Sequence, residues 1–134
     1  MARVVNFSEA LLIGLHSLVL LAKQSPKPAS TKYIASVTGA SENTISKVMQ
    51  RLVKENFIQS SRGPAGGFIL ARLPVEITFK DIYEAIEGKM ETEGCPFNAQ
   101  HCTFKKCIFE NYLNNVSNDI KNFFSGKTLL EYME

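Results

Sequence analysis

Residues 41–54, SENTISKVMQRLVK, decide the fold of this 134-residue chain. Ser41 stands at the N-cap position of a predicted helix, because its side chain can accept a hydrogen bond from the first helical turn. The polar side of the helix carries no acidic residue between Glu42 and Glu55. Its apolar residues recur at the three- and four-residue spacing of one helix face, at Ile45, Val48, Met49, Leu52 and Val53. The segment therefore predicts an amphipathic helix whose exposed face is basic and rich in amides.

The residues on either side of this helix predict a winged helix. A shorter helix is expected from Ser30, as its N-cap, to Gly39, as its end. Only Ala40 separates Gly39 from Ser41, and two short helices joined by a tight glycine turn form a helix-turn-helix. Two strand-like runs then follow, at 57–61 and 68–71, around the turn RGPAGG at 62–67.

Two longer helical segments flank this unit. Residues 8–23 are apolar on more than one side, which predicts burial against the core and against a second subunit. His16 on this apolar helix is interpreted as a core histidine. Residues 107–125 carry a heptad seam that needs a partner, either the first helix or a second subunit, at Phe109, Leu113, Val116, Ile120 and Phe123. Shorter helices are expected from Thr78 to Gly88 and from Thr128 to Met133.

These segments predict a mainly α-helical fold with a small β-hairpin. We expect a winged helix-turn-helix DNA-binding domain over residues 1–75, and a cysteine loop with a long dimerisation helix over residues 76–134. Hydrophobic residues make up 45% and charged residues 21% of the chain, as in soluble globular proteins. The longest apolar run, residues 10–22, is too short to span a membrane and no cleavage site follows it, so we expect a cytoplasmic protein.

The charge of the chain is unevenly distributed. Residues 1–73 carry nine Lys and Arg against three acidic residues, whereas residues 74–134 carry six Lys against ten acidic residues. A basic first half indicates contact with a polyanion there, although charges scattered over a solvated surface would give the same balance.

The predicted recognition helix and hairpin supply the candidate DNA contacts. Asn, Gln, Arg and Lys side chains bond to base edges and phosphates in a major groove. Arg62 is expected to reach the minor groove, while the glycines of the turn let the backbone approach phosphates. The structural alternative is a solvated amphipathic helix beside a flexible hairpin. The candidate contacts with double-stranded operator DNA are Ser41, Asn43, Thr44, Lys47, Gln50, Arg51, Lys54, Arg62, Gly63, Gly66 and Gly67.

All three cysteines, Cys95, Cys102 and Cys107, lie in one predicted loop. Their odd number and the lack of an export signal argue against a disulfide framework. Three thiolates in one loop suit an iron–sulfur cluster or zinc, and His101 keeps a Cys3His zinc site open. A cluster-free thiol sensor is a further alternative. We expect no enzyme, because the chain has no C-x-x-C motif and neither His16 nor His101 has a recognisable catalytic partner.

The segment SRGPAGGFILAR at 61–72 resembles the wing signature of the Rrf2 family of bacterial regulators. The resemblance continues through Pro74, residues 77–88, the three-cysteine loop, the long helix after it and Thr128-Leu129, so it covers essentially the whole chain. It implies a homodimeric winged-helix transcription regulator or repressor that binds palindromic operators. IscR-like, NsrR-like and RirA-like members hold a two-iron or four-iron cluster that reports iron–sulfur, nitric oxide, iron or redox status, whereas CymR-like members hold none.

The resemblance also implies the ligands of such a cluster, Cys95, Cys102 and Cys107, with a fourth ligand that varies. IscR-like members take a His three residues after the last cysteine, where this chain has Glu110. NsrR-like members take an acidic residue near the N-terminus of the partner subunit, and alignment on Phe7 puts Glu9 there. The four residues between Cys102 and Cys107, where about five are expected, indicate a different local loop geometry. Glu9 is therefore the expected fourth ligand, with His101, Glu110 and water as alternatives.

Overall fold

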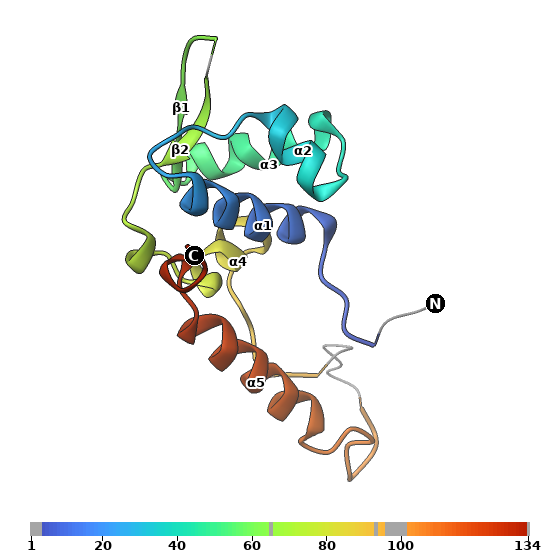
Figure 1. Cartoon of the computed structure of the whole chain (residues 1–134). Coiled ribbons are helices and arrows are strands. Elements are labelled where there is room, and N and C mark those ends of the chain that lie inside the picture. Colours follow the sequence, from blue (N-terminus) through green and yellow to red (C-terminus); the bar gives the residue numbers. More distant parts are fainter. Residues whose placement is uncertain (1–3, 65, 93, 96–101, 134) are drawn as a thin grey trace.

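The computed structural model describes residues 4–64, 66–92, 94–95 and 102–133 (Figure 1). The predicted class, mainly α-helical with one small hairpin, is confirmed. The elements, in chain order, are α1 (Glu9–Gln24), α2 (Thr31–Thr38), α3 (Glu42–Lys54), β1 (Ile58–Ser61), β2 (Gly67–Leu70), the 3-10 turn η1 (Pro74–Glu76), α4 (Phe79–Glu87), α5 (Tyr112–Gly126) and the 3-10 turn η2 (Leu129–Tyr132).

Local hydrogen bonds fix where most of the helices begin. The hydroxyls of Ser8, Ser30 and Ser41 each accept the backbone N–H three residues ahead. Thr78 forms a complete capping box at the start of α4. Gly39 ends α2 with φ of 76°, a left-handed conformation that glycine adopts without steric cost. The predicted boundaries of these helices hold because each depends on groups only three or four residues apart.

The two-stranded wing is joined to the segment before α2. β1 and β2 pair antiparallel, with Ile58 opposite Leu70 and Ser61 opposite Gly67. Ala29 then forms a bridge with Phe68, through backbone N···O distances of 3.0 and 2.9 Å. Ala29 lies outside both predicted strands, and its bridge fixes the hairpin to the helix-turn-helix.

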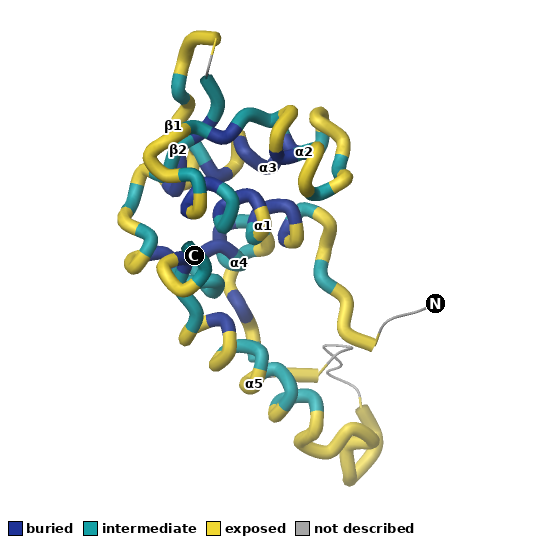
Figure 2. Tube along the Cα trace, in the orientation of Figure 1, coloured by how far each residue is buried: buried dark blue, intermediate teal, exposed yellow. Residues whose placement is uncertain are grey.

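The core lies between α1, α3, α4 and the hairpin, on the inner faces coloured dark blue in Figure 2. Gly14 lets α1 and α4 approach closely, since a Cβ there would lie 2.3 Å from the Ile86 Cδ1 atom. The prediction of a core histidine is wrong. His16 is exposed because it points away from the α1 face that Leu18 and Leu21 bury. Its Nδ1 atom lies 2.7 Å from the carbonyl oxygen of Leu12.

The predicted start of the last long helix is also wrong. α5 begins at Tyr112, and residues 108–111 form a turn in which Glu110 has φ of 53°. A left-handed residue cannot continue an α-helix, so Phe109 lies outside α5. α5 extends away from the winged helix with much of its surface exposed (Figures 1 and 2). No helix in the described ranges has the length and hydropathy needed to cross a membrane.

One residue of the predicted seam of α5, Ile120, packs on its own chain against the cluster of Leu11, Met90 and Phe124. Phe124, which is 6% exposed, packs there in aromatic contact with Phe7, Phe79 and Tyr83. Phe123 on the seam remains 54% exposed. The exposed part of the seam, at Phe123, thus stays available to a second subunit.

Candidate DNA interface and cysteine segment

The exposed face of α3 carries the predicted DNA contacts. Ile45, Val48, Met49 and Leu52 are buried, and this burial fixes the rotation of the helix. The opposite side chains face solvent, namely Asn43, Lys47, Gln50, Arg51 and Lys54.

Two of the predicted contacts are already engaged at the start of α3. The hydroxyls of Ser41 and Thr44 lie 2.7 Å apart, and Ser41 also accepts the Thr44 backbone N–H at 3.1 Å. Ser41 is exposed and Thr44 is half-buried. Both side chains therefore have a structural role in the cap, and their contact with DNA stays a prediction.

The cations of α3 are not neutralised by neighbours. Lys47, Arg51 and Lys54 form no ion pair with any residue in the described part of the chain. Arg72, which belongs to the wing signature, behaves differently. Its guanidinium lies 4.2 Å from the ring centroid of Phe57 and donates to the carbonyl oxygens at the end of α3, at 2.8 and 3.0 Å. Arg72 therefore fastens the wing to α3, while the α3 cations remain available to phosphates.

The wing projects beyond α2 and α3 (Figure 1), and its glycines are required by its own geometry. Gly63 has φ of 105° and accepts the Gly66 N–H at 2.9 Å. A Cβ on Gly66 would lie 2.4 Å from the Ser61 carbonyl oxygen, and one on Gly67 would lie 2.4 Å from that of Ala29. Arg62 is exposed beside this turn. The turn thus presents Arg62 to solvent, and phosphate contacts by the glycines stay a prediction.

One further basic residue of the helix-turn-helix, Lys32, is absent from the predicted DNA contacts. Lys32 lies in the first turn of α2 and is exposed. The first helix of a helix-turn-helix crosses the DNA backbone, so Lys32 is a further candidate for phosphate contact. The position of Lys32 directly after the N-cap, in the first turn of the first helix, is the sequence feature that could have indicated this contact.

The three cysteines are exposed and none forms a disulfide. His101, one alternative fourth ligand, lies outside the described residues. Among the described residues, no group of three or more His, Cys, Asp and Glu side chains comes close enough to hold a metal. The predicted convergence of Cys95, Cys102 and Cys107 is therefore not present in this conformation. Glu9 is exposed in the first turn of α1 and is not brought to the cysteines of its own chain.

The donor set nevertheless fits an iron–sulfur cluster in its chemistry. Three exposed thiols outside any disulfide can bind iron as thiolates. The described residues around the cysteines, 94–95 and 102–107, belong to no helix or strand. Glu110 is held by Lys106, with Nζ 2.7 Å from its Oε1 atom.

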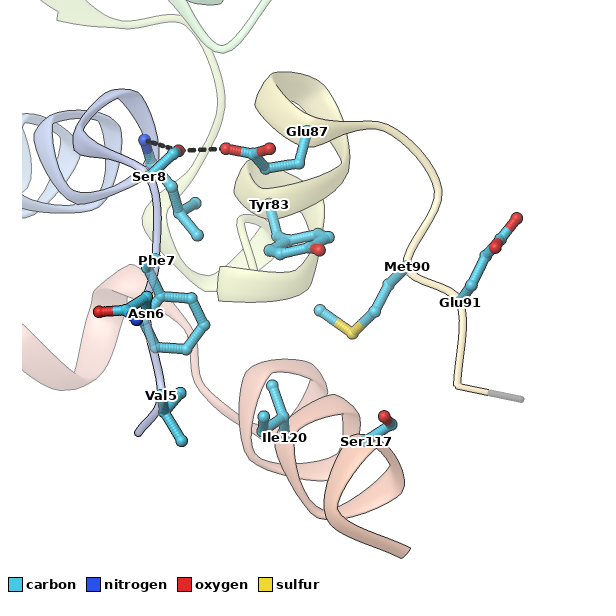
Figure 3. A pocket seen from close by; sticks show the side chains of 11 residues that line it. Val5, Asn6, Phe7, Ser8, Tyr83, Glu87, Met90, Glu91, Ser117 and Ile120 are labelled. Atoms are coloured by element: carbon cyan, nitrogen blue, oxygen red, sulfur yellow. Dashed lines mark hydrogen bonds between the residues drawn. The ribbon is translucent and has the colours of Figure 1, made fainter. Parts of the chain in front are cut away.

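A cavity of about 220 Å³ lies near the start of the cysteine segment (Figure 3). It lies between the residues before α1 and the helices α4 and α5. Phe7, Tyr83 and Ile120 are among the residues that line it. Ser8 donates its hydroxyl hydrogen to Glu87 Oε1 across one side of this cavity. The cavity is thus bordered by both the start of α1 and the end of α4.

Known proteins share both the sequence and the fold of this chain. The Rrf2 family model, described as an iron-dependent transcriptional regulator, matches residues 7–134. A protein of Aquifex aeolicus assigned as a helix-turn-helix transcriptional regulator is 30% identical over 126 residues, which are 92% of this chain and 88% of the relative. The solved IscR of T. potens is 26% identical with a TM-score of 0.75, over 96% of this chain and 85% of that one. CymR of B. subtilis, the global cysteine regulator, has a TM-score of 0.78 at 23% identity over 96% of each chain, a likeness of fold alone. The chain therefore belongs to the Rrf2 family, whose members are DNA-binding transcription regulators and not enzymes.

Proposed function

We propose that this regulator is a cytoplasmic homodimer that controls transcription at its operators. An iron–sulfur cluster on the cysteine segment controls its binding to DNA. The observation that carries the proposal is the set of three exposed thiols between α4 and α5, none of them in a disulfide. The cluster has two or four irons, and its gain, loss or modification reports iron–sulfur, redox or nitric oxide status.

The DNA end of the molecule works through α3 and the wing. Lys47, Arg51 and Lys54 bind phosphates and release counterions, while Asn43 and Gln50 contact base edges in the major groove. Arg62 enters the adjacent minor groove. Two copies related by a two-fold axis read a palindromic operator, because the spacing of the recognition helices sets the spacing of the half-sites.

The dimer forms through the seam of α5 together with exposed apolar residues of α1. Leu113, Val116 and Ile120 are only half-buried, and Phe123 and Leu12 are exposed. Covering these side chains removes apolar surface from water, which stabilises association. A second copy of α5 presents the same seam in reverse, as a two-fold interface requires.

The thiolates of Cys95, Cys102 and Cys107, together with Glu9 of the partner subunit, would hold the cluster. Glu9 is exposed and has no ion pair within the described residues, whereas Glu110 is bound to Lys106. When bound, the cluster supplies iron sites that nitric oxide, oxygen and electrons can change. A carboxylate binds such a site more weakly than a thiolate does, so Glu9 would be the most easily displaced of the four ligands, and its displacement would release the first turn of α1.

Anaerobic purification tests this function. We expect iron with acid-labile sulfide in a brown dimer, together with operator binding in gel shifts that changes when the cluster is removed. Cys107→Ser should lower the iron content, while the apo-protein stays dimeric. Zinc without sulfide would indicate a structural zinc module, and a metal-free protein whose DNA binding responds to thiol oxidation would indicate a cluster-free regulator.

The fourth ligand is tested by a matched pair of variants. Glu9→Ala should leave the dimer folded, keep the thiolate bonds and make the cluster more labile in air. Glu110→Ala removes the same carboxylate from the cysteine segment and should leave the absorption spectrum unchanged. The opposite result would place the ligand at Glu110, and two unchanged spectra would leave His101 or water in that position.

A further inference from the structure

The start of α1 and the end of α4 are joined by one side chain. The Ser8 hydroxyl accepts the Leu11 backbone N–H at 3.1 Å and so caps α1. The same hydroxyl donates its hydrogen to Glu87 Oε1, in the last turn of α4 (Figure 3). Glu9 follows Ser8 directly, so the backbone from which this carboxylate extends is tied to α4.

The segment that leads from α4 to Cys95 is held on the same side of the molecule. The Met90 backbone N–H donates to Glu84 Oε2 at 2.9 Å, and its side chain is 8% exposed in a cluster with Leu11 and Phe124. Five residues of chain reach at most about 17 Å, so Met90 sets an upper limit on the distance between Cys95 and this cluster. α4 thus holds both the start of α1 and the start of the cysteine segment.

We propose that Ser8, Glu87 and Met90 are positioning residues that couple Glu9 to the Cys95 segment of the same protomer. The inference rests on the proposed function, in which Glu9 of each protomer binds the partner's cluster. Each protomer therefore connects two sites. Its Glu9 serves the cluster of the partner, and its cysteines hold its own cluster. Release of Glu9 from one site would move the start of α1, and the Ser8–Glu87 bond would transmit this movement through α4 to the second site, because the two sites share a contiguous set of contacts.

The coupling predicts that dimers with one cluster are less frequent than independent sites would give. Without coupling, about half of the dimers carry one cluster at half loading, and a fivefold coupling lowers this share to about one third. Native mass spectrometry during cluster loss counts dimers with two, one and no clusters. Glu87→Ala removes the acceptor of Ser8 but leaves the α1 cap intact, and it should restore the statistical share. Glu87→Gln keeps an acceptor oxygen and should retain the coupling.

Glu91 provides the matched control. Its carboxylate lines the same cavity and is exposed, and it has no hydrogen bond or ion pair with any other described residue. Glu91→Ala should therefore leave the cluster distribution unchanged. In the apo-protein, Glu87→Ala should speed amide hydrogen exchange in the first turn of α1 by about threefold to tenfold, as expected for one lost hydrogen bond, and Glu91→Ala should not.

The outcomes separate this inference from the proposed function. Absence of iron from the anaerobic wild-type protein contradicts the proposed function, and with it the coupling of clusters. A wild-type protein that carries clusters but loses them statistically contradicts the inference alone. Equal exchange rates in Glu87→Ala and wild-type apo-protein would also overturn it, since the Ser8–Glu87 bond would then hold nothing in place.

Discussion

Gly67→Ala tests whether the glycines of the wing serve the fold or the DNA. A Cβ at Gly67 would lie 2.4 Å from the carbonyl oxygen of Ala29 and 2.6 Å from its carbonyl carbon. Ordinary contacts begin at 3.4 Å, so the wing and the segment before α2 must separate by roughly 1 Å. Both atoms belong to the backbone, and no side-chain rotation can relieve the contact. The separation breaks the bridge between Ala29 and Phe68.

The magnitude follows from the two hydrogen bonds of that bridge. Each contributes about 1 kcal/mol to the free energy of unfolding, and overpacking costs roughly 1–3 kcal/mol more. Alanine also restricts the unfolded chain, which returns about 0.4–1 kcal/mol. The variant should therefore be less stable than the wild type by about 2–4 kcal/mol, a large part of the stability of a small domain.

Equilibrium urea unfolding followed by circular dichroism measures this loss. Gly126→Ala is the control, because a Cβ at Gly126 meets no atom within 4 Å, and its stability should be unchanged or slightly raised. Gel shifts on the folded fraction then report operator affinity. A Gly67→Ala protein that loses less than about 0.5 kcal/mol of stability but binds operator weakly would refute the reasoning. Gly67 would then act by admitting a phosphate.

Four further predictions concern the DNA face, the dimer and the core. Lys47→Ala should reduce the slope of log affinity against log salt concentration by about 0.9. Arg62→Ala should weaken operator binding by about 1–3 kcal/mol. Gel shifts over a salt series measure both effects, and an unchanged slope would exclude a phosphate contact by Lys47. Val116→Asp should give a monomer that loses specific DNA binding, and a monomeric wild type in sedimentation at micromolar concentration would contradict the seam. Ser17 is 0% exposed and its hydroxyl has no hydrogen-bond partner among the described residues, so Ser17→Ala should raise the free energy of unfolding by about 1 kcal/mol in thermal melts. A clear loss of stability instead would mean that this hydroxyl is satisfied in the native protein.

Local interactions explain why so much of the winged helix follows from the sequence. The caps at Ser8, Ser30 and Ser41 each use a hydroxyl and a backbone N–H three residues apart. Gly39 ends α2 because of its own backbone freedom. The buried and exposed faces of α3 follow from a 3.6-residue period that is complete within 13 residues. These features need no information from distant parts of the chain.

The same locality explains the errors. The heptad spacing around Phe109 is real, but the left-handed Glu110 ends the helical stretch before α5 begins. Periodicity reports which residues would share a helix face, and it does not report where backbone conformation interrupts the helix. The prediction that His16 lies in the core was wrong for a related reason. An apolar helix of a small protein has one side that its own core does not cover, and His16 lies on that side.

The sequence by itself determined the helix-turn-helix, the hairpin and the chemical character of the cysteine segment, since each depends on neighbouring residues. Only the tertiary structure decided that Ala29 pairs with Phe68, that Arg72 binds the end of α3, and that Ser8 joins α1 to Glu87. These contacts join residues up to 79 positions apart in the chain. Their formation depends on how the helices pack around a shared core, which fixes distances that no local pattern encodes.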